Sequence, residues 1–283
     1  MKRYILKLSC PDRAGIVHAV TGVLLAHQAN ILSSAQYGDA DHQRFFMRIE
    51  FESAAALDAL QQAFAPLAVQ MAMDWELVDA AHKTRVLILV SKFGHCLNDL
   101  LFRVATQHLN IEVVAIASNH RDFYQLAASH NVPFHHLPLL GATPEQKAAQ
   151  EAKLKAIIEE QSVELVVLAR YMQILSQDLC EFLSGRAINI HHSFLPSFKG
   201  ARPYHQAFER GVKLIGATAH YVTGDLDEGP IIEQEVARID HAYSPEQLAA
   251  TGRDMECVAL ARAIQWHAEH RVLLNGRRTV VFR

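Results

Sequence analysis

The feature that most constrains the fold is a series of short apolar segments, separated by helical patterns, that begins near residue 84. The apolar segments have the length of strands and lie at 86–90, 113–117, 165–169 and 188–190. Helical patterns separate them at 96–107, 123–130 and 145–160. Strands that are apolar on both faces, with helices between them, are typical of a sheet covered by helices on both sides. We therefore predict a doubly wound, mostly parallel α/β domain over residues 84–283.

The first 80 residues have a different pattern. Alternating apolar and polar residues predict strands at 4–9, 31–37, 44–51 and 69–77. Helical patterns lie at 16–24, preceded by Asp12, and at 54–64. The order βαββαβ in about 80 residues is that of a ferredoxin-like split sandwich. A short polar join over residues 80–84 follows it. A chain of 283 residues exceeds the usual size of one domain, so we predict two, 1–80 and 84–283.

The composition argues against several classes of partner. The 27 basic and 30 acidic side chains give a net charge of −3, which provides no basic surface for nucleic acid. No apolar run approaches the ~20 residues of a membrane helix, and the N-terminus turns polar too soon for a signal peptide. The cysteines, at 10, 96, 180 and 257, form no CxxC pair and are typical of a reducing compartment. We expect a cytoplasmic protein that binds neither nucleic acid nor membrane.

The segment 188–200 carries the most chemical information. It begins inside a predicted strand, where the period of two sends Asn189 and His191 to one face and His192 to the other. Ligands of doubly wound sheets bind beyond the carboxyl ends of strands, so Asn189 and His191 can converge there. A second segment, 216–230, reads as a strand followed by an acidic turn. That turn can place a carboxylate such as Asp227 beside the imidazole.

An amide donor, an imidazole and a carboxylate suit attack on a formyl carbonyl. Asn189 and a protonated His191 can stabilise the oxyanion that develops on the carbonyl oxygen. A nearby carboxylate stabilises the charged imidazole and can accept a proton from the attacking group. From the residues alone, an alternative stays open in which Asn189 and His191 are structural and Asp227 only organises a turn.

Residues 85–283 resemble the formyltransferase family that includes glycinamide ribonucleotide transformylase. The resemblance rests on the order and separation of four segments, at 189–191, 195–200, 216–220 and 225–230. It implies a catalytic trio of Asn189, His191 and Asp227. Asp225 is a rival for the carboxylate, but the Asp-x-Gly-Pro match selects Asp227. His220 matches a second histidine near the family's site, although a hydrogen-bonded strand histidine is an equal alternative.

The segment 168–176 resembles the pterin-binding segment of the same family. A flat heteroaromatic ring needs apolar walls and a few donors and acceptors at its edge, which a loop leaving the strand at 165–169 could supply. An ordinary hydrophobic core is the alternative interpretation for its apolar members. The substrate-binding residues that the resemblance implies are Arg170, Met172, Gln173, Ile174 and Leu175, together with His220.

Residues 1–80 resemble an ACT domain, a small ligand-sensing module. The motif lies at 10–17, Cys-Pro-Asp-Arg-Ala-Gly-Ile-Val, between the first strand and the first helix. Gly15 allows close backbone approach, and the helix start offers free N–H groups to a carboxylate. The resemblance implies an amino-acid effector at Asp12, Gly15 and Ile16, and a homo-oligomer, because ACT modules commonly pair. The motif could also be only a turn and a helix cap.

An ACT domain followed by a formyltransferase domain is the arrangement of the formyltetrahydrofolate deformylase family. The resemblance then covers nearly the whole chain. It implies hydrolysis of 10-formyltetrahydrofolate to formate and tetrahydrofolate, in the one-carbon metabolism that serves purine biosynthesis. A non-catalytic folate-binding regulatory protein is one alternative, and the intact trio counts against it.

The other alternative is a phosphoribosylglycinamide formyltransferase. Such transferases carry a Gly-Ser-Asn phosphate cradle after their first strand, where this chain has Ser-Lys-Phe-Gly-His-Cys-Leu-Asn-Asp at 91–99. Phe93 and His95 would crowd a phosphate that small residues let the backbone wrap. Asp99 would repel the anion if it faced the site, whereas Lys92 argues the other way. The loop therefore favours water as the formyl acceptor.

Seventeen histidines raise the question of a metal. The adjacent pairs 135–136 and 191–192 point to opposite faces if extended. His267 and His270, on an expected helix at 245–270, lack HExxH spacing, and no cysteine lies close enough for a Cys/His site. We expect that helix face to be solvated. We therefore expect no metal and no cofactor, since folate is the substrate.

Overall fold

The structure is a computed structural model that describes residues 1–139, 143–195 and 203–283. Its contacts define two compact units, Met1–His82 with Trp266–Arg283, and Lys83–Gln265. The sequence predicted one domain over residues 84–283, but the structure groups Trp266–Arg283 with the N-terminal unit. In the described parts of the chain, no helix has the length and apolarity needed to cross a membrane.

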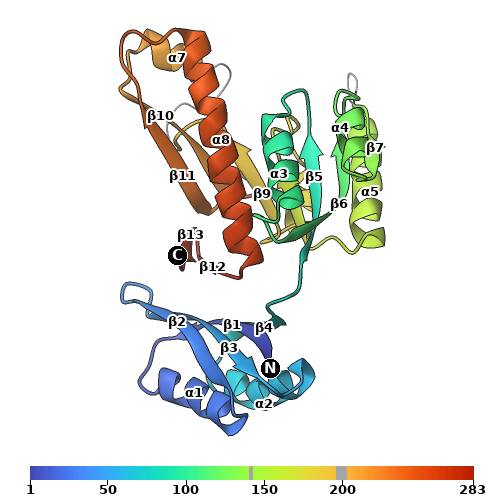
Figure 1. Ribbon diagram of the computed structural model, residues 1–283. Coiled ribbons are helices and arrows are strands. Elements are labelled where there is room, and N and C mark those ends of the chain that lie inside the picture. The colour runs from blue at the N-terminus through green and yellow to red at the C-terminus, as the bar shows by residue number, and fades with distance from the viewer. Residues whose placement is uncertain (140–142, 196–202) are drawn as a thin grey trace. The chain divides into compact units, whose positions relative to one another are not determined.

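The first unit contains the predicted βαββαβ order (Figure 1). Its antiparallel sheet has the strand order β2-β3-β1-β4, and α1 and α2 cover one face. The predicted strand at 69–77 begins later, because Phe64 and Ala68 continue the buried face of α2 for another turn. The elements are β1 (Lys2–Pro11), α1 (Ile16–Ala26), β2 (Asn30–Asp39), β3 (Arg44–Ser53), α2 (Leu57–Gln70) and β4 (Asp74–Asp79).

A C-terminal hairpin completes this unit. Strands β12 (Val272–Asn275) and β13 (Arg278–Val281) pair across a two-residue turn. Alternation along β3 turns Phe46 away from the helices, and Leu273 and Phe282 of the hairpin segment pack against it. The sheet is therefore covered on its second face by residues from the far end of the chain.

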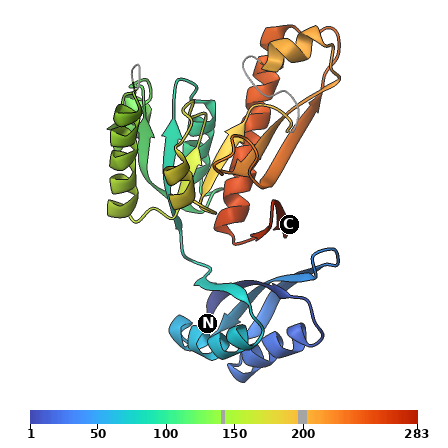
Figure 2. The same ribbon diagram turned by 180° about the vertical axis from the view of Figure 1, so that it is seen from behind.

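The second unit is the predicted doubly wound sheet, with strand order β11-β10-β9-β8-β5-β6-β7. The five strands from β9 to β7 are parallel, and β10 runs antiparallel to both of its neighbours, β9 and β11. Helices α5 and α6 pack on one face, and α3 and α8 lie over the other (Figures 1 and 2). The strands are β5 (Thr84–Val90), β6 (Ile111–Ser118), β7 (Phe134–His136), β8 (Leu165–Leu168), β9 (Ala187–His191), β10 (Leu214–Tyr221) and β11 (Ile231–Arg238). The helices are α3 (His95–Ala105), α4 (Tyr124–Ser129), α5 (Pro144–Glu160), α6 (Gln177–Phe182), α7 (Pro203–Glu209) and α8 (Pro245–Ala268).

The central strands β5, β8 and β9 are neighbours and parallel, so their carboxyl ends meet at one edge of the sheet. Ser91, Arg170 and His192 each follow closely after one of these strands. This is the edge at which doubly wound sheets bind their ligands.

Candidate active site

The antiparallel pairing of β9 with β10 brings Asn189 and His220 directly opposite each other. Opposed residues of an antiparallel pair point to the same face, and the Asn189 amide nitrogen lies 3.3 Å from His220 Nε2. Asn189 and His191 line the same pocket, as the period of two predicted. The segment 196–202, which includes most of the matched 195–200 motif, lies outside the described residues.

Asp227 lies between the two imidazoles, on the turn after β10. Its carboxylate oxygens are 3.2 Å from His191 Nδ1 and 3.6 Å from His220 Nε2. Its backbone is in the left-handed region, at φ 57°, which few residues other than Gly, Asn and Asp adopt. The rival Asp225 is exposed, and its backbone carbonyl accepts hydrogen bonds inside the turn.

Gly229 is required by the same turn. A Cβ on Gly229 would lie 1.7 Å from the carbonyl oxygen of Tyr221 and 3.2 Å from His220 Nδ1. The Asp-x-Gly-Pro turn can therefore approach β10 only with glycine at this position.

The charge of Asp227 is stabilised by its two neighbours. Burial raises the pKa of Asp227, but hydrogen bonds from His191 and His220 outweigh it and hold that pKa well below its usual range. His220 Nδ1 is 2.8 Å from the Tyr221 carbonyl, which can only accept, so Nδ1 carries a proton. His220 Nε2 is then left to accept from Asn189 or, when protonated, to face Asp227.

The second nitrogen of His191, Nε2, is buried and has no hydrogen-bond partner among the described residues. Its ring stacks on that of His192, with centroids 5.1 Å apart and planes at 27°. The expectation that the two histidines point to opposite faces was wrong, because β9 ends at His191 and alternation stops there. Burial, with the nearby charges of Arg170 and His191, lowers the pKa of His192 to about 4, so this ring is neutral at pH 7.

The predicted pterin-binding segment forms one wall of this pocket, whose volume is about 270 Å³. Met172 and Ile174 are 52% and 64% exposed, so they are not the ordinary core that the alternative interpretation proposed. Leu175 packs partly against the core beneath the sheet. Exposed apolar side chains lining a pocket are suited to covering a flat apolar ligand. The described pocket lining includes Arg170, Tyr171, Met172, Gln173, Ile174, Leu175, Cys180, Asn189, His191, His192, His220, Thr223 and Asp227.

Ser91 fixes the start of this segment. Its backbone N–H donates to the Arg170 carbonyl at 3.2 Å, and its hydroxyl accepts from the Met172 N–H at 2.9 Å. The hydroxyl proton goes to Asn119 Oδ1 at 2.7 Å. These contacts hold Arg170 in a left-handed conformation, at φ 64°.

Arg170 contacts a carboxylate that sequence reasoning missed. Its Nε is 3.4 Å from Glu256, a residue of α8 that is 1% exposed. Glu256 also accepts from the Tyr204 hydroxyl at 2.8 Å and is 2.7 Å from His95 Nε2. Burial raises the pKa of Glu256, but His95, Arg170 and Tyr204 lower it by more. The carboxylate is therefore charged. The available signal was a lone acidic residue on a helix face that otherwise reads as apolar or small, at Gly252, Ala259, Leu260 and Ala263.

The ligand atoms of His95, Cys96 and Glu256 lie within 4.8 Å of one another, a spacing that could hold a metal ion. His95 and Glu256 already share a hydrogen bond, and the adjacent Arg170 guanidinium would repel a cation. A hydrogen bond with Cys257 and burial raise the pKa of Cys96, which keeps its thiol protonated. This donor set suits a hydrogen-bonded network better than a metal.

The expectation that the helix face carrying His267 and His270 is solvated was wrong. His270 Nδ1 lies 3.3 Å from Glu76, and the His270 side chain is 16% exposed. Burial is also the main cause that lowers the pKa of His267 to about 3.

The loop over residues 91–99 bears on the transferase alternative. Phe93 is half exposed and lies under the Arg170 guanidinium, 5.5 Å from ring to cation, and His95 is bound to Glu256. The expectation that Asp99 would repel an anion was wrong, because Asp99 pairs with Arg103 at 2.7 Å and its charge is compensated within α3.

The ACT motif has a conformation that requires glycine. Gly15 precedes α1 with φ 91°, and a Cβ there would meet no atom within 4 Å, so the glycine supplies conformation rather than space. Ile16 is 2% exposed and could offer a ligand only its backbone. The Asp12 side chain is exposed, and its backbone N–H donates to Gln43.

Comparisons with known proteins match both parts of the chain. Residues 84–264 match the family model described as formyl transferase, and residues 4–67 match that of the ACT domain. A relative from Corynebacterium sp. (strain P-1), named formyltetrahydrofolate deformylase, is 54% identical over 284 residues, which cover 99% of this chain and 98% of the relative. The crystal structure of formyltetrahydrofolate deformylase from Burkholderia mallei ATCC 23344 matches with a TM-score of 0.96 at 53% identity, over 100% of both chains. Glycinamide ribonucleotide transformylase 1 from Symbiobacterium toebii matches with a TM-score of 0.67 at 31% identity, over 71% of this chain and 95% of that one.

Proposed function

This chain belongs to the formyltetrahydrofolate deformylase family, and from that premise we propose that it hydrolyses 10-formyltetrahydrofolate to formate and tetrahydrofolate. The observation that carries the proposal is His191 Nε2, a buried nitrogen without a partner among the residues that the structure describes, in a pocket with apolar walls. When the ring is protonated, this nitrogen donates a hydrogen bond and suits a reacting oxygen, because a buried polar group without a partner costs free energy. We propose Asn189, His191 and Asp227 as the catalytic residues.

The oxyanion is the first intermediate that the site must stabilise. When water attacks the formyl carbon, the carbonyl oxygen gains negative charge. A protonated His191 donates to that oxygen from Nε2, while Asp227 holds the charged ring through Nδ1. Asn189 has a second amide hydrogen beyond the one directed at His220, and it donates to the same oxygen.

The reaction also moves protons. The attacking water loses one proton as it adds, and N10 of the folate gains one as the C–N bond breaks. The Asp227–His191 pair makes these two proton transfers in the proposed mechanism, and the attacking water binds beside it. His220 accepts from Asn189 at Nε2 and holds that amide in place, as a positioning residue.

The folate ring is proposed to lie against Met172, Gln173, Ile174 and Leu175. These residues lie on a wall that Ser91 anchors through Met172. Binding and chemistry then use different side chains, so changes in the trio should reduce turnover more than affinity.

Water rather than an amine is the proposed acceptor. A transferase must also hold its amine substrate, and a phosphate anchor would supply much of that binding energy. Here Phe93 and the His95–Glu256 pair fill the region after β5 with bulky side chains. The exposed Lys92 is the feature that favours a phosphate.

The test is a formate-release assay with and without glycinamide ribonucleotide. We expect full-rate formate release without any amine, and no formylated product when glycinamide ribonucleotide is added. Diversion of the formyl group into that product would identify a transformylase with an added regulatory domain. Absence of both products would favour a non-catalytic folate-binding protein.

No metal or cofactor is proposed. The Asp227–His191 pair would activate the water, and Arg170 beside the His95, Cys96 and Glu256 cluster disfavours a cation. Dialysis against a chelator should therefore leave the rate unchanged. A loss of activity that zinc or another divalent ion restores would overturn this proposal.

The ACT unit is proposed to bind an amino acid at Asp12, Gly15 and Ile16 and to mediate self-association in the cytoplasm. The start of α1 offers backbone N–H groups for a carboxylate, and Gly15 leaves open space beside them. Thermal shift with glycine and methionine, and sedimentation, test these two points separately.

A further inference from the structure

Arg170 is a buried cation whose hydrogen-bonding capacity is only partly used. Its side chain is 10% exposed, and its Nε faces Glu256 at 3.4 Å. Within the described parts of the chain, neither Nε nor Nη1 makes a hydrogen bond. Four buried side-chain atoms lack a partner among the described residues, and three of them belong to Arg170 and His191. Both residues line the same pocket.

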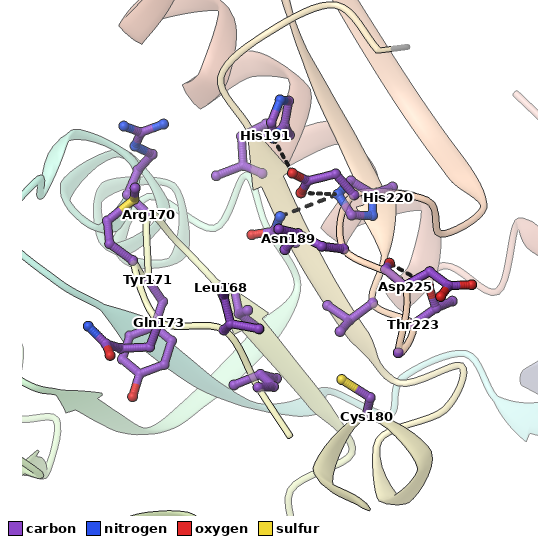
Figure 3. Close-up of a pocket in the computed structure, with 18 of the residues that line it drawn as sticks. Leu168, Arg170, Tyr171, Gln173, Cys180, Asn189, His191, His220, Thr223 and Asp225 are labelled. Carbon is purple, nitrogen blue, oxygen red and sulfur yellow. Dashed lines mark hydrogen bonds and ion pairs between the residues drawn. The ribbon is translucent and has the colours of Figure 1, made fainter. Parts of the chain in front are cut away.

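These unused donors lie near each other. Figure 3 shows the Arg170 guanidinium at the same end of the pocket as His191, while Cys180 lies at the other end. His191 stacks on His192 with ring centroids 5.1 Å apart, and the charge of Arg170 lies near enough to lower the pKa of the His192 ring. The donors are therefore at the reacting end of the pocket.

We propose that Arg170, with His191 beside it, forms a subsite for a small carboxylate, and that the ligand is formate, the product of the function proposed above, on which this inference rests. Buried donors without partners cost free energy, and a charged acceptor recovers it. The unpartnered Nη1 can donate to one oxygen of a carboxylate, and the planar guanidinium lets Nη2 donate in parallel to the other. Glu256 balances the charge of Arg170 when formate is absent.

The chemistry explains why a product subsite is useful here. A bond forms between the water oxygen and the formyl carbon, and the bond from that carbon to N10 breaks. Of the two protons of the water, one goes to N10 and one goes to solvent through the Asp227–His191 pair, leaving formate with one negative charge. The formyl group is neutral until this point, so Arg170 interacts more strongly with product than with substrate. Formate held in its charged form is a poor electrophile, which disfavours the reverse attack by N10.

A carboxylate at this subsite could also come from the glutamate tail of folate. That tail is part of both 10-formyltetrahydrofolate and tetrahydrofolate, so it would contact Arg170 before and after the reaction. If Arg170 binds the tail, its substitution raises KM for 10-formyltetrahydrofolate but not for 10-formyltetrahydropteroate, which lacks the glutamate. If Arg170 binds formate, its substitution weakens formate binding and affects both substrates alike.

The test measures formate binding directly, by titrating the full-length protein, saturated with tetrahydrofolate, with ¹³C-formate and following its NMR line width. Arg170→Gln should weaken formate binding about tenfold or more, the scale of a lost charge-assisted pair. Arg170→Lys should restore part of the affinity. Because Arg170→Gln leaves Glu256 buried without its cation, the double variant Arg170→Gln/Glu256→Gln provides a neutral pair that keeps the fold. Lys92→Gln, which changes an exposed cation, is the matched control and should bind formate as the wild type does.

Unchanged formate affinity in Arg170→Gln and in Arg170→Gln/Glu256→Gln, or an effect confined to the glutamate-bearing substrate, overturns the inference. Formate release is assayed separately on the wild type. If the wild type releases formate but formate binding does not depend on Arg170, only the subsite is contradicted. If formate binding depends on Arg170 but no formate is released, only the proposed function is contradicted.

Discussion

Asp227 is the residue on which the charge balance of the site depends most. Two imidazoles flank its carboxylate, and its backbone takes a left-handed conformation that a tight turn imposes. Strained backbone of this kind persists only where the surroundings hold it, and it is frequent at functional sites. Asp225, two residues earlier, has none of these contacts to the described imidazoles and is exposed.

We expect His191→Ala and Asp227→Asn each to reduce turnover by about 10²–10³, the usual effect of losing a strong oxyanion donor. The double variant should lose little more, because Asp227 acts through His191. Folate affinity, measured by fluorescence quenching, should largely survive. Asp225→Asn is the matched control and should keep normal turnover; near-normal turnover in Asp227→Asn would instead move the carboxylate role elsewhere.

His192 gives a prediction for pH. Its folded pKa of about 4 lies below the ordinary value of 6.5, so the unfolded chain binds the proton more readily between these values. The free energy of unfolding should therefore fall as pH drops from 6.5 to 4, by about 3 kcal/mol at most, and should lose nothing more from this group below 4. Urea denaturation across this range should show a shallower fall in His192→Gln. His18→Gln, an exposed histidine on α1, should leave the slope unchanged, and equal slopes in all three proteins would contradict the assignment.

At the scale of elements, the sequence predicted those whose periodicity was strong. The parallel strands and the βαββαβ order were confirmed, because burial on both faces or on alternate residues leaves a clear pattern. The start of β4 was wrong, since the residues after Phe64 suit a helix and a strand equally. The hairpin β12–β13 was missed although Asn275-Gly276 is a recognised turn signal.

The residues of the site could likewise be predicted only where a regular pattern held. Asn189 and His191 could be placed together because both lie inside a strand, where the period of two holds. His192 could not, since it lies just beyond the strand. The contact of Glu256 with Arg170 joins residues on α8 and after β8, and no local pattern encodes which helix face meets which loop.

The turn after β10 is the element that positions Asp227, and Gly229→Ala tests it. The new Cβ would collide with the backbone oxygen of Tyr221, so the turn must move away from β10. We expect a loss of about 1–3 kcal/mol in the free energy of unfolding and a marked fall in turnover. Gly22→Ala, on the exposed side of α1 with no atom within 4 Å, should be neutral or stabilising by up to ~1 kcal/mol. Equal stability and turnover in both variants would show that the turn tolerates the methyl group.

At the scale of the whole molecule, the chain is folded so that its two ends share one unit. Arg48, 4% exposed on β3, donates from Nε and Nη2 to the Glu269 carbonyl at 3.1 and 3.0 Å. Asn275 on the hairpin donates to the buried Asp39 at 2.6 Å. The N-terminal unit therefore depends on residues that follow the second unit in the sequence.

This arrangement changes how a catalytic fragment should be cut. A fragment of residues 84–283 keeps the hairpin but removes the sheet against which Leu273 and Phe282 pack, leaving both side chains without their apolar partner Phe46. A fragment of residues 84–265 ends where the second unit ends and contains neither Leu273 nor Phe282. We expect the longer fragment to self-associate or precipitate, because its hairpin carries unmatched apolar surface. The shorter fragment should stay monodisperse by light scattering and release formate, with any response to amino acids lost. If the longer fragment is the better behaved of the two, the hairpin is part of the catalytic unit, and the boundary at residue 283 predicted from the sequence is correct.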